Sequence, residues 1–184
     1  MPSLLDPLFS KLVELKQFRE ISANIKTEKF DIFIREAQTV EIAGFLGLPL
    51  YSAMVADWDP VLEQFNDERF NELWFGIDYV NNAGVDIRFR GYQPSALYYA
   101  YSRFLKQQQT NVSRFGVQSI QDTVSVDQSA GTVRTKANDA EQMAKTYELQ
   151  TATFLYEKRT TYPEFYQNNS GPSNNTAFDF FVLR

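Results

Sequence analysis

The sequence predicts a mainly α-helical fold: a helical bundle with a small β-hairpin, a long extended loop and an extended C-terminal tail. Three observations predict it. Apolar residues recur at helical spacing in several segments, strand-like alternation is confined to one short stretch, and two stretches are long and polar. We expect a helical domain over residues 1–163, with an extended arm at 109–135, followed by a flexible tail at 164–184. The chain has 184 residues, 43% of them hydrophobic, which suffices for a core of this size.

The N-terminal part predicts two amphipathic helices. Residues 3–18 place apolar side chains at three- and four-residue spacing, and Ser3 is a residue that caps helices. We expect the apolar face of this helix to meet another subunit. A second helix is expected to begin at Thr27 and to run to about Phe45, with Gly47 as its stop.

The middle of the chain predicts two shorter helices and a hairpin. Pro49 suits the first turn of a short helix, and a further helix is expected over residues 61–74. In the stretch 78–90, apolar and charged residues then alternate around a turn at Asn81–Gly84. Such a pattern is typical of a two-stranded hairpin with one half-buried face.

The C-terminal half predicts two long helices separated by the arm. The first, after Pro94, has aromatic residues on nearly every face, so we expect neighbours to surround it. The second covers residues 136–158. The arm is poor in large apolar residues, and a loop of that length in a compact domain indicates a function. We predict that its larger residues contact a partner: Phe115, Val117, Ile120, Val124 and Val126.

The tail ends in an apolar segment beyond a polar linker rich in Asn, Ser and Gly. Such a segment cannot easily reach its own core, so we expect it to dock on another protein as a strand or anchor. The residues that we expect to make this contact are Phe178, Phe180, Phe181, Val182 and Leu183.

Cysteine and histidine are both absent from the sequence. Their absence excludes disulfides, thiolate nucleophiles, cysteine or histidine metal sites and a histidine base. Carboxylate chemistry around Mg²⁺ stays open, and Asp57 and Asp59 are the candidate pair, although a solvated turn explains them better. We therefore expect a protein that is not an enzyme, with no catalytic residues, no metal site and no cofactor.

The charge is unevenly distributed. The net charge is −5, yet residues 85–120 hold five basic residues and a single acidic one. This basic zone consists of Arg88, Arg90, Arg103, Lys106 and Arg114. One interpretation is pairing with acidic residues of the N-terminal half, in the same or a neighbouring subunit. The other is a basic lining that meets DNA phosphates without sequence preference.

The order of elements resembles that of the head-to-tail connector proteins of tailed bacteriophages, also called adaptor or head-completion proteins. The resemblance lies in the helix end Phe45–Tyr51, the hairpin exit Phe89–Tyr92, the helix Ala96–Phe104, the excursion at Phe115–Ser119, and a last helix ending near residue 162. It spans about residues 20–165, and the sequence is also similar to prophage proteins of Bacteroidota.

The resemblance implies a structural virion protein made in the cytoplasm of the host bacterium. It implies a homo-oligomeric ring of the phage neck, commonly twelvefold, that joins the portal to the tail and helps to seal the DNA-filled head. The expected partners are the portal protein, other neck or tail proteins and packaged DNA. We expect no contact with a membrane, because the sequence has no apolar run of the required length and no secretory signal.

Three alternatives remain open. The first is another virion part, such as a tail terminator or a minor capsid protein. The second is a Mg²⁺-dependent enzyme built on carboxylates such as Asp57, Asp59 and Glu63. The third is a binding module whose aromatic helix lines a pocket for a small molecule.

Overall fold

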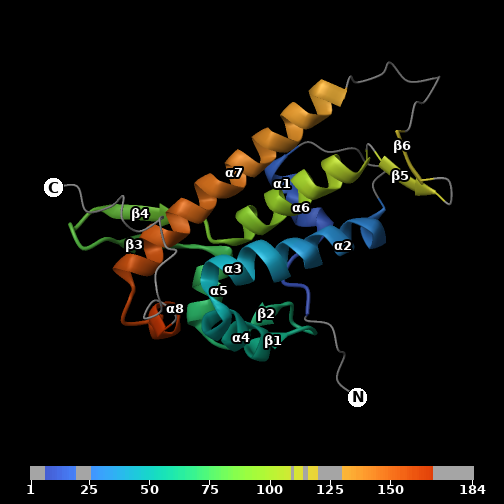
Figure 1. Ribbon diagram of the computed structural model, residues 1–184. Helices are drawn as coiled ribbons and strands as arrows, with labels where there is room; N and C mark the ends of the chain where they lie inside the picture. The colour runs from blue at the N-terminus through green and yellow to red at the C-terminus, as the bar shows by residue number, and fades with distance from the viewer. Residues whose placement is uncertain (1–6, 20–25, 109, 114–115, 120–129, 168–184) are drawn as a thin grey trace.

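The protein is mainly helical, as the sequence predicts, and its described residues form three small two-stranded sheets where the sequence predicts one hairpin. The computed structural model describes residues 7–19, 26–108, 110–113, 116–119 and 130–167, with side chains outside 108–130 (Figure 1). The helices are α1 (Leu12–Phe18), α2 (Thr27–Ala37), the π-helix η1 (Gln38–Ile42), α3 (Ala43–Leu46), α4 (Leu48–Asp57), α5 (Glu68–Phe75), α6 (Gln93–Gln108), α7 (Ala130–Glu157) and α8 (Pro163–Gln167). The strands are β1 (Trp58–Asp59), β2 (Gln64–Phe65), β3 (Ile77–Val80), β4 (Asp86–Phe89), β5 (Thr110–Ser113) and β6 (Gly116–Ser119).

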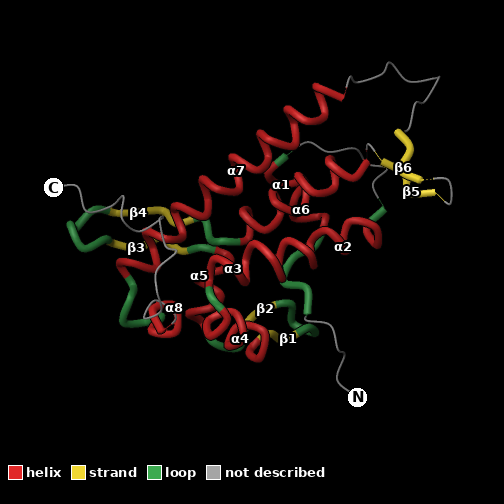
Figure 2. Tube along the Cα trace, in the orientation of Figure 1, coloured by secondary structure: helices red, strands yellow, loops and turns green. Residues whose placement is uncertain are grey.

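The helices stack in layers. α7 packs along α6, α6 packs against α2, and α4 with the β1–β2 pair lies on the far side of α2 and α3 (Figure 2). α7 therefore forms one outer side of the molecule and the β1–β2 pair the opposite side. The β3–β4 hairpin extends at one end, and the β5–β6 hairpin at the other (Figure 1).

α6 is the centre of the core, which confirms the prediction from its all-round apolar sequence. Leu97 and Ala100 are fully buried, and α1, α2, η1 and α7 all contact this helix. Tyr98 stacks on Tyr147 of α7 with ring centroids 6.0 Å apart, while Phe104 meets Phe30 of α2 edge-on at 5.5 Å. The aromatic residues of α6 thus bind the layers together.

The N-terminal segment differs from the expected helix over residues 3–18, of which residues 1–6 lie outside the described part. The helix begins at Leu12, and Pro7–Lys11 is not helical. The reason is tertiary. The buried amide of Gln38 accepts the N–H of Phe9 at 3.0 Å and donates to the carbonyl of Pro7 at 2.7 Å. The indole N–H of Trp74 donates to the Phe9 carbonyl at 3.0 Å.

Phe9 explains why this binding outweighs helix formation. Its ring is buried among four other aromatic rings, those of Tyr51, Trp58, Phe65 and Trp74. Leu12 and Leu15 of α1 are also buried in this chain's own core. For these three residues, the expectation that the apolar face of the first helix meets another subunit is therefore wrong.

The helix expected over residues 61–74 begins later, at Glu68. The carboxylate of Asp67 caps it by accepting the backbone N–H of Arg69 at 3.0 Å. Ahead of it, residues 60–63 form a turn between the paired strands β1 and β2. Phe65 in β2 enters the aromatic cluster of Phe9, which favours this arrangement over a continuous helix.

The β3–β4 hairpin forms where the alternation predicts it, with Ile77 opposite Phe89 and Val80 opposite Asp86. Its base is a close contact between two backbones, at Gly76 and Gly91. Both glycines have positive φ, 98° and 78°. A Cβ on Gly76 would lie 2.4 Å from the Phe89 carbonyl oxygen, and one on Gly91 would lie 2.3 Å from that of Trp74. Only glycine fits at either position.

The boundaries of the arm and the tail also change. Residues 130–135 belong to α7 and are not part of an extended arm, and residues 110–119 include the paired strands β5 and β6. Residues 164–167 belong to α8, where Phe165 is buried against the core, so the domain extends beyond residue 163. The sequence missed α8 because Phe165 and Tyr166 stand beside a polar, loop-like composition.

Candidate assembly surface

One end of the molecule projects beyond the packed core. We call it the distal end and define it as the β5–β6 hairpin (residues 110–119) with the first turns of α7 (residues 130–136). α7 has 28 residues and α6 has 16, so at about 1.5 Å per residue α7 is longer by about 18 Å. Figure 1 shows the start of α7 and the β5–β6 hairpin reaching away from the remaining elements.

The first turns of α7 have little support from their own chain. Residues 131–136 are exposed or half-buried, and the first fully buried side chain of α7 is that of Ala137. Helical turns gain most of their stability in proteins from packing of an apolar face. A partner that covers these turns would supply that packing.

The β5–β6 hairpin consists of two antiparallel strands, with Thr110 opposite Ser119 and Ser113 opposite Gly116. Within the described residues this sheet has no third strand, so each strand has one unpaired edge. Two-stranded hairpins are marginally stable alone, and free edges accept further strands. The hairpin is therefore suited to contact with another chain.

The predicted contact residues fall mainly outside the described part of the chain. Val117 lies in β6, of which the backbone alone is described. The remaining predicted contact residues lie outside the described part of the chain: Phe115, Ile120, Val124, Val126, Phe178, Phe180, Phe181, Val182 and Leu183. The basic residue Arg114 also lies outside it. Their contacts stay predictions.

The structure does not bring the basic zone together. Arg88 lies in β4 and Arg90 directly after it, at the end of the molecule that carries the β3–β4 hairpin. Arg103 and Lys106 lie in the last turns of α6, close to β5. The length of α6 separates the two pairs, about 20 Å at 1.5 Å per residue. Their contact with DNA stays a prediction.

Arg103 and Lys106 both form ion pairs within the subunit. The guanidinium of Arg103 donates to Glu41 at 2.6 Å and to Glu36 at 3.2 Å, which joins α6 to η1 and α2. Lys106 pairs with Glu141 of α7 at 2.7 Å. The interpretation that the basic zone pairs with acidic residues of the N-terminal half therefore holds for Arg103. Arg88 faces Asp78 at 3.8 Å with both side chains highly exposed, a pair that adds little stability.

A second polar group lies between α6 and α7, around the half-buried carboxylate of Glu148. The hydroxyl of Tyr99 donates to it at 2.9 Å and that of Tyr92 at 3.3 Å. Burial raises the pKa of Glu148, and the two tyrosine hydrogen bonds oppose that rise. Burial, together with the charge of Glu148, raises the pKa of both tyrosines. Sequence reasoning missed this group because its members are 49 and 56 residues apart.

The carboxylates proposed for Mg²⁺ have structural partners. Asp59 accepts the backbone N–H groups of Val61 and Leu62 at 2.7 and 3.1 Å. Asp57 accepts the N–H of Asp67 at 2.8 Å. Across the described residues, no group of three or more acidic side chains is arranged to hold a metal ion. These geometries fit the interpretation of the two aspartates as turn residues.

The outer face of α7 carries a row of uncharged side chains that the sequence interpretation overlooked. We call it the α7 stripe and define it as Gln142, Met143, Thr146, Leu149, Gln150, Thr153 and Tyr156. Leu149 is 50% exposed and Tyr156 59%. Thr146 and Thr153 donate their hydroxyls to the carbonyls of Gln142 and Leu149 in their own helix. The sequence feature that could have revealed the stripe is the spacing of these residues by three, four and seven positions along one helix.

An open depression lies on the β3–β4 hairpin and is lined by Asp78, Tyr79, Asp86, Ile87 and Arg88. Burial, with the Glu157 carboxylate nearby, raises the pKa of Tyr79 to about 12, so this phenol is neutral at physiological pH.

Among the helices in the described part of the chain, none has the length and apolarity required to cross a membrane.

Comparison with known proteins gives one family. No curated protein and no solved structure matches the chain. Residues 42–175, from the π-helix through α8 and beyond, match a family of unknown function, DUF6712. The matched region includes the core helix α6, both hairpins and α7. The chain therefore belongs to the family of unknown function DUF6712.

Proposed function

We propose that the protein is a structural subunit of a bacteriophage neck. In this role it forms an oligomeric ring, the head–tail connector, that joins the portal to the tail and helps to seal the DNA-filled head. The observation that carries the proposal is the distal end. Its helical turns project from a well-packed core with exposed or half-buried side chains at residues 131–136, and its two strands form a sheet with no third strand among the described residues.

The shape of the subunit supports this role. The β3–β4 hairpin and the distal end extend from opposite ends of the same core, so one subunit offers contacts in two directions (Figure 1). One end can then face the DNA while the other contacts a partner, and the sides of the core stay available for neighbouring copies in a ring.

The core between the two ends is built to stay rigid. α6 is buried from Gln93 to Ser102, and its ion pairs to η1, α2 and α7 connect the layers. Arg69 joins α5 to α8 through a bidentate ion pair, in which its guanidinium donates to both carboxylate oxygens of Glu164 at 2.9 and 3.0 Å. A rigid core with partner-dependent ends suits a repeated part of an assembly.

In this ring, Arg88 and Arg90 are the basic residues that we assign to DNA. Both side chains are exposed, and Arg88 forms a weak surface pair with Asp78. Arg103 and Lys106 are not assigned to this role because both pair with glutamates within the subunit.

The experiment is binding to the portal protein encoded by the same genome. Purified protein is mixed with portal rings, and the complex is separated by sedimentation. We expect co-sedimentation at a fixed ratio of the two proteins and a new layer on one face of the portal in negative-stain images. A failure to bind the portal under conditions in which other neck proteins bind would overturn the proposal.

A further inference from the structure

The turn between β1 and β2 displays apolar side chains to solvent. We call residues 60–62 (Pro60, Val61 and Leu62) the knob. Val61 is 86% exposed and Leu62 is 61% exposed, so both aliphatic side chains lie almost wholly outside the core. Exposed aliphatic residues at adjacent positions of a turn are candidates for a contact with another protein.

The knob is held in a fixed conformation. The Asp59 carboxylate accepts the N–H groups of Val61 and Leu62, which fixes the backbone of the turn from within. Glu63 follows with φ of 55°, an unfavourable value for a residue with a side chain, and pairs with Lys11 ahead of α1. Strained residues that their surroundings hold in place cluster at functional sites. The turn is therefore preformed for binding.

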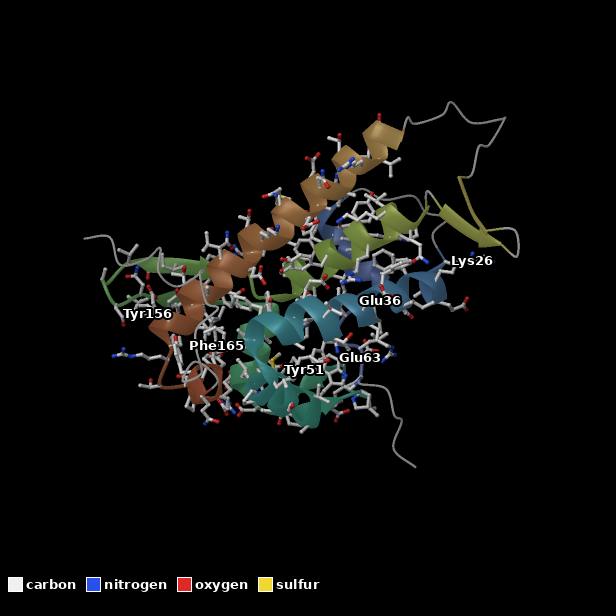
Figure 3. The ribbon with its side chains drawn as sticks, viewed as in Figure 1. Lys26, Glu36, Tyr51, Glu63, Tyr156 and Phe165 are labelled. Carbon is white, nitrogen blue, oxygen red and sulfur yellow. The ribbon has the colours of Figure 1, made fainter. Side chains whose placement is uncertain are left out.

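The α7 stripe is the matching surface on the opposite side of the molecule. It offers Leu149 and Tyr156 within a row that has no charged side chain. α6, α2 and α3 lie between the stripe and the knob, so the two surfaces of one chain cannot meet (Figure 1). Tyr156, on α7, and Glu63, beside the knob, are correspondingly far apart in Figure 3.

The charges around the two surfaces are complementary. The segment 57–68, which contains the knob, has five acidic residues and no basic one. The α7 stripe is flanked by the exposed basic residues Lys145 and Arg159, of which Lys145 also pairs with Glu141 at 3.3 Å. Opposite charge around apolar contacts guides two copies into one orientation and disfavours knob-to-knob pairing.

We propose that the knob of one copy docks on the α7 stripe of the next copy, as the head-to-tail contact of the ring. This assignment rests on the proposed ring assembly and names the surfaces that build it. A contact between two different patches on opposite sides is heterologous, the type that generates rings. The occupant of each surface is a second copy of this chain.

Because the chain has no cysteine, single cysteines report this contact directly. The variants L62C and T146C are prepared separately in the full chain, one of them with a larger tag, then mixed and oxidised. We expect the 62–146 heterodimer to exceed both homodimers several-fold on a non-reducing gel. The control is L62C mixed with I32C, because Ile32 is 58% exposed on α2, outside both surfaces.

A second variant tests the same contact without cross-linking. V61D/L62D places two charges in the knob, and we expect self-association to weaken about tenfold or more while the circular dichroism of the monomer is unchanged. I32D is the matched control and should leave self-association unaltered.

The outcomes separate the two proposals. If rings form but the 62–146 pair is no more abundant than the 62–32 pair, the assignment of these surfaces is overturned and the ring stands. If V61D/L62D leaves self-association unchanged but abolishes binding to the portal, the occupant is wrong. If the chain neither assembles nor enriches the 62–146 pair, alone or with the portal, both proposals fail.

Discussion

Gly76 and Gly91 lie against each other at the base of the β3–β4 hairpin, where β3 leaves the core and the chain returns to α6. Each has positive φ. A Cβ on Gly76 would overlap backbone atoms at the end of β4, and a Cβ on Gly91 would overlap backbone atoms at the end of α5. The Tyr92 N–H donates to the Leu73 carbonyl at 2.9 Å beside this contact. These residues therefore determine where the hairpin leaves the core.

The first prediction is that G91A lowers the free energy of unfolding by at least about 2 kcal/mol, because alanine is strained at this φ and overlaps backbone that cannot move aside. Urea denaturation measures it. The control is G44A, at a glycine in α3 with no atom near its added Cβ; there we expect a change within about 1 kcal/mol. Equal losses for both variants would contradict the account.

The second prediction concerns Glu164, whose pKa is lowered mainly by its hydrogen bond with Arg69. A lowered pKa means that the ionised carboxylate stabilises the fold above the ordinary value of 4.5, and that this contribution is lost as the pH falls through the lowered pKa. We expect E164Q to cost about 1–3 kcal/mol at pH 7. The difference between wild type and variant should shrink in denaturation experiments at progressively lower pH.

Glu148 leads to a third prediction, with the opposite sign. Burial raises its pKa, so ionisation disfavours the folded state, and stability is lost as the pH rises from the ordinary value of 4.5 through the raised value. We expect the free energy of unfolding of wild type to exceed that of E148Q by most at low pH, and this difference to shrink toward neutral pH. Unfolding free energies of both proteins across this range test it, and a constant difference would refute it.

At the scale of elements, the first turns of α7 are the segment whose stability depends on assembly. The fourth prediction is that backbone amides of residues 131–136 exchange hydrogen rapidly in the isolated subunit and become protected in the assembled form, because packing then replaces solvent. Residues 140–155 of the same helix include buried side chains and provide the internal control, with slow exchange in both states. Rapid exchange of residues 131–136 in both states would show that no partner covers them.

The elements that the sequence predicted correctly are those whose pattern is local. α6 is recognisable from apolar residues on all sides, and the β3–β4 hairpin from alternation around Asn81–Gly84. The start of α1 was predicted wrongly because Gln38, 29 residues away from Phe9, binds the extended segment and outweighs helix propensity. The late start of α5 has the same kind of cause, since Phe65 is drawn into the aromatic cluster.

The candidate site was harder to predict than the fold. Arg88 and Arg103 lie 15 positions apart in the sequence, and their common charge indicated a single zone. A buried helix instead separates them, and Glu41 neutralises one of them. The knob was hidden because its residues were assigned to a helix, where Val61 and Leu62 would have been ordinary core candidates. Position in space decides which charges and apolar groups remain free for a partner, and a single sequence does not specify it.

At the scale of the whole molecule, four surfaces take part in the proposed assembly. The distal end would contact a partner, the knob and the α7 stripe would join neighbouring copies, and the exposed arginines of the β3–β4 hairpin would face DNA. The rigid layers around α6 hold these surfaces at fixed positions relative to each other (Figure 1). A ring subunit needs this arrangement because errors in angle accumulate from copy to copy.

The most direct test of this account is the mass of the particle that the purified chain forms, measured by light scattering with negative-stain images, alone and with the portal. The account predicts closed rings of a single size, formed either by the chain itself or on the portal. A monomer of 21.3 kDa under both conditions would contradict it.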